Sequence, residues 1–251
     1  MTGQLALRQV AWEQRLFWRN RQAAIFTFVL PVGLLAFGAL GRHSDVDGHP
    51  YTYLFVPGLI GTAIVFTTFA GIAITLVVRR DSGILKRVRG TPLPPAVYLG
   101  ALAGSMALVL ALEAVIIVAV GSTLLDLSAP DSPLELLGLV VLGAFAFAAL
   151  AFAIVPLVPS AEGSSAVISS VYLPLLGLSG AFFPLHRLPA GLHELADVLP
   201  LSHLLTALRD AYGGGGMSGR DAAGLLVTLA WALAGALVAV RRFGWEPRGG
   251  S

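Results

Sequence analysis

Two groups of side chains in this sequence have types and spacing that suggest chemistry, and both lie in a chain with few charges. The first is the basic run in RRDSGILKRVRGTPLPPAVY (79–98). The second is Glu113, a carboxylate inside the apolar stretch ALVLALEAVIIVAV. A basic run can bind nucleic acid, lipid headgroups or another protein. A carboxylate in an apolar segment can relay protons, contact a substrate, or bond to a Ser, Thr or backbone group of a neighbouring helix.

No nucleotide-binding or hydrolytic motif accompanies these residues in the sequence. The glycine run 213–216 lacks the Gly-Lys-Ser/Thr of a P-loop, and no zinc-protease or serine-hydrolase signature occurs. The absence of cysteine excludes disulfides and thiolate catalysis. We therefore expect this chain to have no catalytic residue, no metal and no bound cofactor, and not to be an enzyme.

The composition predicts a membrane protein. Of 251 residues, 56% are hydrophobic and only 12% are charged, whereas a soluble domain carries about 25% charged residues. A bilayer core of ~30 Å requires roughly 20 apolar residues per helix. We predict an all-α, polytopic protein with a single transmembrane domain over 1–251 and six spans, at about 23–41, 53–78, 97–121, 136–158, 164–183 and 222–240.

The positive-inside rule gives the orientation of these spans. With six spans, 12 of the 16 Lys and Arg residues lie on the side that carries both termini and the loop after the second span. This distribution predicts that both termini and the basic run are cytoplasmic, in a multi-pass protein of the cell membrane.

Two segments are too charged to span and are predicted to lie along the membrane surface. Residues 4–20 read as an interfacial helix with arginines on one narrow face and aromatic rings beside them, which suits the headgroup layer. Its predicted anchors are Arg8, Trp12, Arg15, Trp18 and Arg19. Residues 188–212 read as two amphipathic helices on the opposite, outer side, with Leu188, Leu192, Leu195 and Leu199 on one helical face.

Hydroxyl and aromatic side chains within the spans are the candidates for a translocation path. The second span mixes the two types, as suits an amphipathic organic ligand, and the fifth span is rich in serine, which marks helix–helix contact or a polar path. Structural packing explains both sets equally well. With Glu113, the candidate residues are Thr62, Phe66, Phe69, Ser169 and Tyr172.

The basic run predicts a short helix within a loop at 79–96. Asp81 or Ser82 can begin this helix, Gly90 with Pro92 ends it, and Leu85 belongs to its small apolar face. Lipid attraction requires positive charge alone, and nucleic-acid binding requires a supporting fold or stacking platform that a short loop lacks. A helix with an apolar face favours insertion into a groove on a partner protein.

The stretch RRDSGILKRVRGTPLPPAVYLG closely resembles the cytoplasmic loop between the second and third spans of type-2 ATP-binding-cassette (ABC) exporter permeases. FWRNRQAAIFTFVLPVGLLAFG is similar to the entry of that family into its first span, and FFPLHRLPAGLHELADVLPLSHLLTALRDAY to its outer segment. Together the three motifs cover nearly the whole chain, and the greatest similarity is to small drug- and antibiotic-resistance permeases.

The resemblance implies a complex in which the permease and the ATPase are separate subunits. Two six-span subunits would pair, as a homodimer or a related heterodimer, each on a cytoplasmic ATPase that uses ATP and Mg²⁺. The second and fifth spans would line the path, and the N-terminal helix would also touch the ATPase. The resemblance assigns coupling to Arg80, Asp81, Gly83, Leu85, Lys86, Arg87 and Arg89. Asp81 stands alone where relatives often have two acids.

Four functions remain open from the sequence. The first is export of amphipathic drugs, natural products or lipids, and the second is export of a polysaccharide or polymer-linked lipid by the same fold. The third is a non-transporting immunity or assembly protein of the membrane. The fourth is an ion-coupled carrier that uses Glu113. The direction of transport follows from the resemblance alone, and no nucleic acid is expected among the partners.

Overall fold

The computed structural model describes residues 2–38, 40, 45–46, 49–124, 126–182, 189–214, 216 and 218–243. In chain order its elements are α1 (Thr2–Arg19), α2 (Arg21–Gly38), β1 (Asp45–Val46), β2 (His49–Pro50), α3 (Tyr51–Ala63), η2 (Ile64–Ala70), α4 (Gly71–Asp81), α5 (Ile84–Arg89), α6 (Pro95–Leu124), α7 (Pro133–Ile154), η3 (Val155–Leu157), α8 (Ser164–Leu178), α9 (Ala190–Val198), α10 (Pro200–Gly213) and α11 (Gly219–Arg242).

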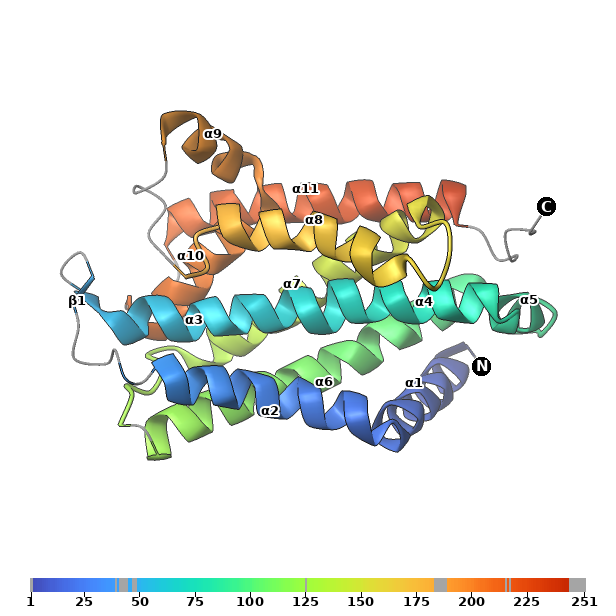
Figure 1. Ribbon diagram of the computed structural model, residues 1–251, viewed down its shortest axis with the longest axis horizontal. Coiled ribbons are helices and arrows are strands. Elements are labelled where there is room, and N and C mark those ends of the chain that lie inside the picture. Colours follow the sequence, from blue (N-terminus) through green and yellow to red (C-terminus); the bar gives the residue numbers. More distant parts are fainter. Residues whose placement is uncertain are drawn as a thin grey trace.

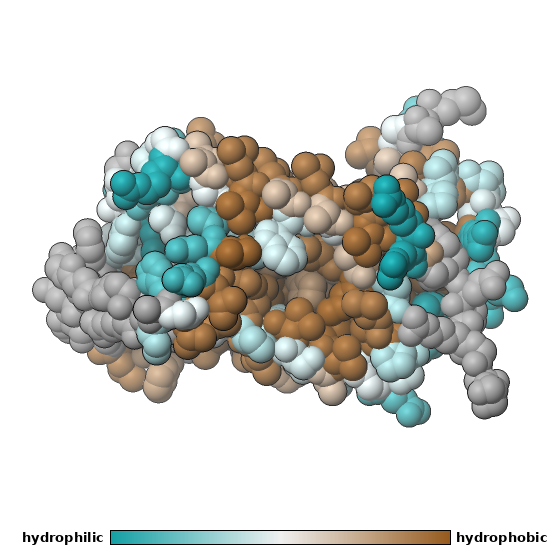
Figure 2. Space-filling model, turned by 90° about the horizontal axis from the view of Figure 1, so that it is seen from above, coloured by the Kyte–Doolittle hydropathy of each residue, from teal (hydrophilic) through white to brown (hydrophobic). Residues whose placement is uncertain are grey.

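The predicted all-α, polytopic membrane fold is confirmed. The two-residue strands β1 and β2 pair antiparallel, and they are the only strands in the described part of the chain. The long helices run side by side along the bundle (Figure 1). On the face that Figure 2 shows, apolar side chains occupy the middle of the molecule and polar side chains gather towards its two ends. This distribution is the one that a bilayer requires, since charged groups are costly in the hydrocarbon core.

Five helical segments are long and apolar enough to cross a membrane: Arg21–Gly38, Tyr51–Asp81, Pro95–Thr123, Pro133–Leu157 and Gly219–Arg242. They contain the predicted second, third and sixth spans, and the fourth except for its last residue, Val158. The first prediction, 23–41, continues past the end of its helix at Gly38, and residues 39 and 41 lie outside the described residues.

The predicted fifth span is shorter than expected. In place of 164–183, helix α8 covers 15 residues, Ser164–Leu178. At 1.5 Å per residue it is roughly 22 Å long, less than the ~30 Å hydrocarbon core. Gly180, with φ 75°, follows its end, and Phe183 lies outside the described residues. Helix α8 runs back along the bundle beside the second span (Figure 1). The count of six spans therefore stays a prediction.

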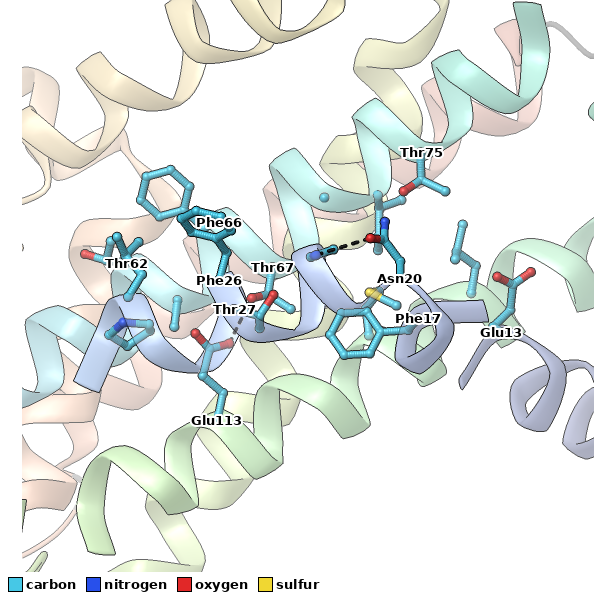
Figure 3. A pocket seen from close by; sticks show the side chains of 18 of the residues that line it. Glu13, Phe17, Asn20, Phe26, Thr27, Thr62, Phe66, Thr67, Thr75 and Glu113 are labelled. Atoms are coloured by element: carbon cyan, nitrogen blue, oxygen red, sulfur yellow. Dashed lines mark hydrogen bonds between the residues drawn. The ribbon is translucent and has the colours of Figure 1, made fainter. Parts of the chain in front are cut away.

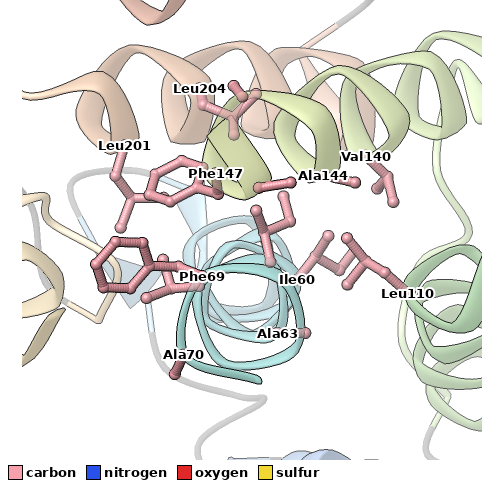
Figure 4. Packing of buried hydrophobic residues seen from close by; sticks show 14 of the residues in the cluster. Ile60, Ala63, Phe69, Ala70, Leu110, Val140, Ala144, Phe147, Leu201 and Leu204 are labelled. Atoms are coloured by element: carbon pink, nitrogen blue, oxygen red, sulfur yellow. The ribbon is translucent and has the colours of Figure 1, made fainter. Parts of the chain in front are cut away.

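The second span forms the centre of the packing. It is one continuous helical rod made of α3, η2 and α4, and its buried side chains meet α6, α7 and α10 (Figure 4). Ile60 and Phe69 of this rod pack near Phe147 of α7 and Leu201 of α10 (Figure 4). Because these helices all pack on the second span, a movement of this span would displace them as well.

The two predicted outer helices differ from each other. Helix α9 exposes Leu192 and Leu195, whereas the predicted Leu188 lies outside the described residues. Helix α10 packs inside the protein, and its place on the outer side of the membrane stays a prediction. Leu201, Leu204 and Leu208 are fully buried against α3, α7 and α11, because the apolar face of α10 packs on protein at this end of the bundle.

Helices α1 and α5 and the last turn of α11 lie at one end of the bundle, and α9 and α10 lie at the other (Figure 1). This arrangement places the basic stretch and the N-terminal helix on the same side, as the charge distribution predicted. The connection between α7 and α8 also lies at the end that carries α5.

Candidate functional site

A cavity of about 410 Å³ lies between α1, α2, the second span and α6 (Figure 3). This volume is within the range of small-molecule sites, ~300–1,000 Å³. Its walls are mostly apolar, with Phe26, Leu30 and Leu34 from α2. The same three residues are exposed at the surface, so the cavity opens sideways out of the bundle. Its polar lining consists of Glu13, Asn20, Thr27, Thr62, Thr67, Thr75, Arg79 and Glu113.

A π-helical segment presents the second span to this cavity. In η2, the amide of Gly71 bonds to the carbonyl of Phe66, five residues earlier, which is the wider π-helical repeat. Such segments are often found at functional sites, where they alter the direction of side chains. Phe66 and Thr67 of η2 both line the cavity, whereas Thr68 is buried and donates to the carbonyl of Ile64.

Glu113 of α6 reaches the cavity from the opposite wall. Its side chain is only 3% exposed. The hydroxyl of Thr67 donates to Glu113 Oε2 over 2.8 Å (Figure 3). The bond links the third span to the π-helical part of the second, so the structural role that the sequence left open for Glu113 is realised. The same carboxylate also lines the cavity, where it is available to a ligand.

The cavity ends on the α1 side at an ion pair between α1 and the second span. Glu13 is 2% exposed, and Arg79 binds it with both terminal nitrogens, Nη1 to Oε1 over 2.8 Å and Nη2 to Oε2 over 2.6 Å. Arg79 Nη1 also donates to the hydroxyl of Tyr98 in α6, over 2.7 Å. A bidentate arginine–carboxylate pair fixes orientation as well as distance. Three elements, α1, α4 and α6, are thus held at one point.

The structure places the predicted path residues in two groups. Thr62, Phe66 and Glu113 line the cavity. Tyr172 of α8 packs edge-to-face on Phe66, with ring centroids 5.0 Å apart, and so lies next to it.

Two other predicted path residues have different surroundings. Phe69 is buried in the core among α7 and α10 residues (Figure 4). The Ser169 hydroxyl donates to the carbonyl of Ala166 in its own helix. Their role in a path stays a prediction that the cavity does not support.

Helix α5 is a short basic helix held to the bundle by two apolar side chains, the buried Leu85 and the partly buried Val88. Leu85 is fully buried, and Gly83, with φ 73°, makes the left-handed turn that begins the helix. The predicted cap is wrong, since no side chain caps α5 and the Ser82 hydroxyl bonds back to Val78 in α4. Gly90 follows the end of the helix as predicted. The cationic side chains of Lys86, Arg87 and Arg89 are exposed.

Arg80 and Asp81 face inward, away from the surface that α5 offers to a partner. Arg80 is 2% exposed, and its guanidinium donates to the carbonyls of Val155 and Val158 at the end of the fourth span. Asp81 accepts from Arg80 Nε and from the amide of Ala161. These two residues tie the second span to the turn that leads into α8. Their predicted contact with an ATPase stays a prediction, and the contacts that the structure shows are with this turn.

The five predicted anchors of α1 are all exposed: Arg8, Trp12, Arg15, Trp18 and Arg19. Trp18 also stacks on Phe28 of α2, with ring centroids 5.5 Å apart. Gln14, which accepts from Trp18 Nε1 over 3.0 Å, joins α1 to the bundle by donating to the carbonyl of Ser105 in α6 over 2.7 Å. Anchoring to lipid stays a prediction, and docking on α6 is the contact that the structure shows.

Sequence reasoning missed the Glu13–Arg79–Tyr98 cluster. A signal was present, since Glu13 is the only acidic residue among the first 44, and a lone carboxylate in a basic helix invites a search for its partner. The partner is 66 residues away, and no local pattern indicates that distance.

Comparison with known proteins covers most of this architecture. The family model for the ABC-2 type transporter matches residues 6–212. The chain belongs to the ABC-2 type transporter family. The matched residues include α2 to α9 and α10 as far as Tyr212, and hence both walls of the cavity and the basic helix α5. This ABC-2 chain is accordingly a transmembrane permease subunit and not an ATPase domain.

Individual relatives of this ABC-2 permease carry the name Nodulation protein J. The protein of that name from Sinorhizobium fredii is 31% identical over 179 residues, which cover 70% of this chain and 68% of the relative. That from Neorhizobium galegae is 29% identical over 169 residues, or 66% of this chain and 64% of the relative. That from Rhizobium meliloti is 37% identical over 78 residues, or 31% of this chain and 30% of the relative.

Proposed function

We propose that this ABC-2 permease is the membrane subunit of an ATP-driven exporter for amphipathic drugs, natural products or lipids. Two permease subunits, identical or related, would pair in the cell membrane. Each would rest on a separate cytoplasmic ATPase that binds ATP and Mg²⁺. The end of the bundle that carries α1, α5 and the last turn of α11 is the cytoplasmic end in this proposal, because it gathers the cationic side chains.

The observation that carries this proposal is the mounting of α5. Its three cations are exposed, Leu85 is buried beneath them, and Arg80 joins the adjoining end of the second span to the turn before α8. A force applied to α5 is therefore passed to the second span, which lines the cavity and forms the centre of the core. A loop that only attracted lipid headgroups would have no need of this rigid connection.

The cavity supports an amphipathic cargo. Its walls are mostly aliphatic and aromatic, and its polar groups are few, as is usual for sites that bind small organic molecules. A polysaccharide or polymer-linked lipid is the competing cargo, and a compound panel that contains both classes decides between them by the one that stimulates ATP hydrolysis.

The test is purification with the candidate ATPase and measurement of ATP hydrolysis in lipid nanodiscs. Reversal of Lys86, Arg87 and Arg89 to glutamate is expected to abolish complex formation and substrate-stimulated hydrolysis. The matched control reverses Arg241 and Arg242, which are exposed at the same end of the bundle, and should leave the complex intact. Unchanged complex formation after reversal in α5 would show that α5 is not the docking element.

The same preparation tests the two remaining functions. A non-transporting role predicts no ATPase partner and no hydrolysis that responds to compounds. An ion-coupled carrier predicts transport that continues after removal of the ATPase and stops in Glu113→Gln. Our proposal predicts the loss of transport when the ATPase is removed.

A further inference from the structure

Glu113 is a buried carboxylate with capacity for one more partner. Thr67 donates to Oε2, and no other residue in the described part of the chain donates a hydrogen bond to this carboxylate. Burial of a carboxylate in an apolar environment is costly unless donors surround it. The group borders the cavity, so a ligand there can provide the donor that the protein does not.

The other charges of the cavity neutralise each other. Both terminal nitrogens of Arg79 bind Glu13, and one of them also donates to Tyr98. The guanidinium is thus committed to protein groups. An anionic head group in the cavity would meet Glu113 with no free cation beside it among the described lining residues. A cationic head group would find an unneutralised counter-charge.

The apolar part of the cavity suits the rest of such a molecule. Phe26 of α2 and Phe66 of η2 both line the cavity (Figure 3). Leu30 and Leu34 of α2 and Met106 of α6 extend the apolar wall. Aromatic faces also attract cations. The volume of about 410 Å³ is sufficient for a small organic molecule.

We propose that this cavity binds an amphipathic amine, with the protonated nitrogen donating a hydrogen bond to Glu113 and the apolar body against α2 and Phe66. The inference deepens the proposed function and rests on it, since it names the chemical class that the exporter recognises. Thr67 holds one carboxylate oxygen in place, and the second oxygen is left for the ligand.

The test measures binding to the permease alone in nanodiscs, with empty nanodiscs to subtract partition into lipid. The probe is radiolabelled decylamine. Its competitors have the same chain and a different head: decyltrimethylammonium has the charge without a donor, and decanol has the donor without the charge. Each competitor is expected to bind about tenfold more weakly than decylamine, because a charge-assisted hydrogen bond requires both features.

The decisive variant is Glu113→Gln, which removes the charge and keeps the size and the bond from Thr67. It is expected to lower the affinity for decylamine about tenfold and to change that for decanol less than twofold. Glu135→Gln is the matched control, since Glu135 is exposed and lies outside the cavity. This control should bind both probes as the wild-type protein does.

Three results would overturn the inference: equal binding of decanol and decylamine, wild-type binding of decylamine by Glu113→Gln, or loss of both probes in that variant. The last result would mean that Glu113 maintains the shape of the cavity. Because this assay contains no ATPase, its failure leaves the permease assignment standing if the complex still forms and hydrolyses ATP. Failure to form the complex would instead count against the proposed function.

Discussion

Removal of the charge from Glu13 is expected to loosen α1 from the bundle. In Glu13→Gln, the guanidinium of Arg79 loses the carboxylate that both of its terminal nitrogens bind and retains the hydroxyl of Tyr98. Breaking a buried pair on one side costs about 3–5 kcal/mol. Arg79 is 15% exposed and keeps one partner, so we expect the lower figure, ~3 kcal/mol, in the free energy of unfolding.

The double variant separates pairing from general damage. Arg79→Gln alone leaves a buried carboxylate with Gln9 as its remaining donor and is expected to cost at least as much. Glu13→Gln with Arg79→Gln removes both charges, so its cost should not exceed that of the milder single variant. The resulting coupling energy is about 3 kcal/mol, at the upper end of values for residues in contact.

Two measurements check this expectation. Equilibrium unfolding in mixed micelles gives the free energies. The chain has no cysteine, so Val10→Cys, at a half-buried position of α1, reports release of the helix by its reaction with a maleimide. Glu162→Gln, the same change on an exposed side chain, is the control and should stay within about 0.5 kcal/mol of wild type. Additive costs in the double variant would refute the reasoning, because independent sites add.

Three further changes test the packing around the second span. Gly58→Ala places a methyl group 1.9 Å from a backbone carbonyl after α8, so it should lower the free energy of unfolding by ~1–3 kcal/mol and the melting temperature with it. Gly33→Ala meets nothing within 4 Å and should leave the melting temperature unchanged. Equal effects of the two variants would refute the close approach at Gly58. Arg80→Lys loses the forked contact with the fourth-span carbonyls and should cost about 2 kcal/mol in unfolding experiments; wild-type stability would contradict those bonds. Leu85→Ala should lower the free energy of unfolding by ~2–4 kcal/mol and reduce ATPase stimulation. Ile84→Ala, at an exposed position of the same helix, should leave the free energy of unfolding nearly unchanged. Similar losses of stability in both variants would contradict the anchoring role of Leu85.

Hydropathy predicted the helical fold well because a bilayer imposes the same requirement along the whole chain. A span must be long and apolar, and this property is visible in the sequence. The prediction was weakest at α8 and α10, where length and polarity depend on neighbouring protein. Helix α10 has the amphipathic pattern of a surface helix, yet protein and not lipid covers its apolar face.

The candidate site was predictable in its residues but not in its assembly. Glu113 was recognised because a charge in an apolar span is costly, and its bond to Thr67 matches the general expectation for such a group. Arg80 was assigned to coupling with the ATPase from the family resemblance, and its buried contacts were not predicted. Its acceptors are backbone carbonyls at a helix end 75 and 78 residues away. Because every residue has a backbone carbonyl, no residue type in the sequence identifies these acceptors.

The contacts of α1 set an order for the biosynthesis of this permease. Glu13 is made early, but its partner Arg79 lies at the end of the second span, and Ser105, which Gln14 binds, lies in the third. Until those spans have been made and inserted, the first helix has neither contact. Truncated chains that end before Arg79 should therefore carry an undocked N-terminal segment, open to quality-control proteases, whereas chains that extend through α6 should protect it.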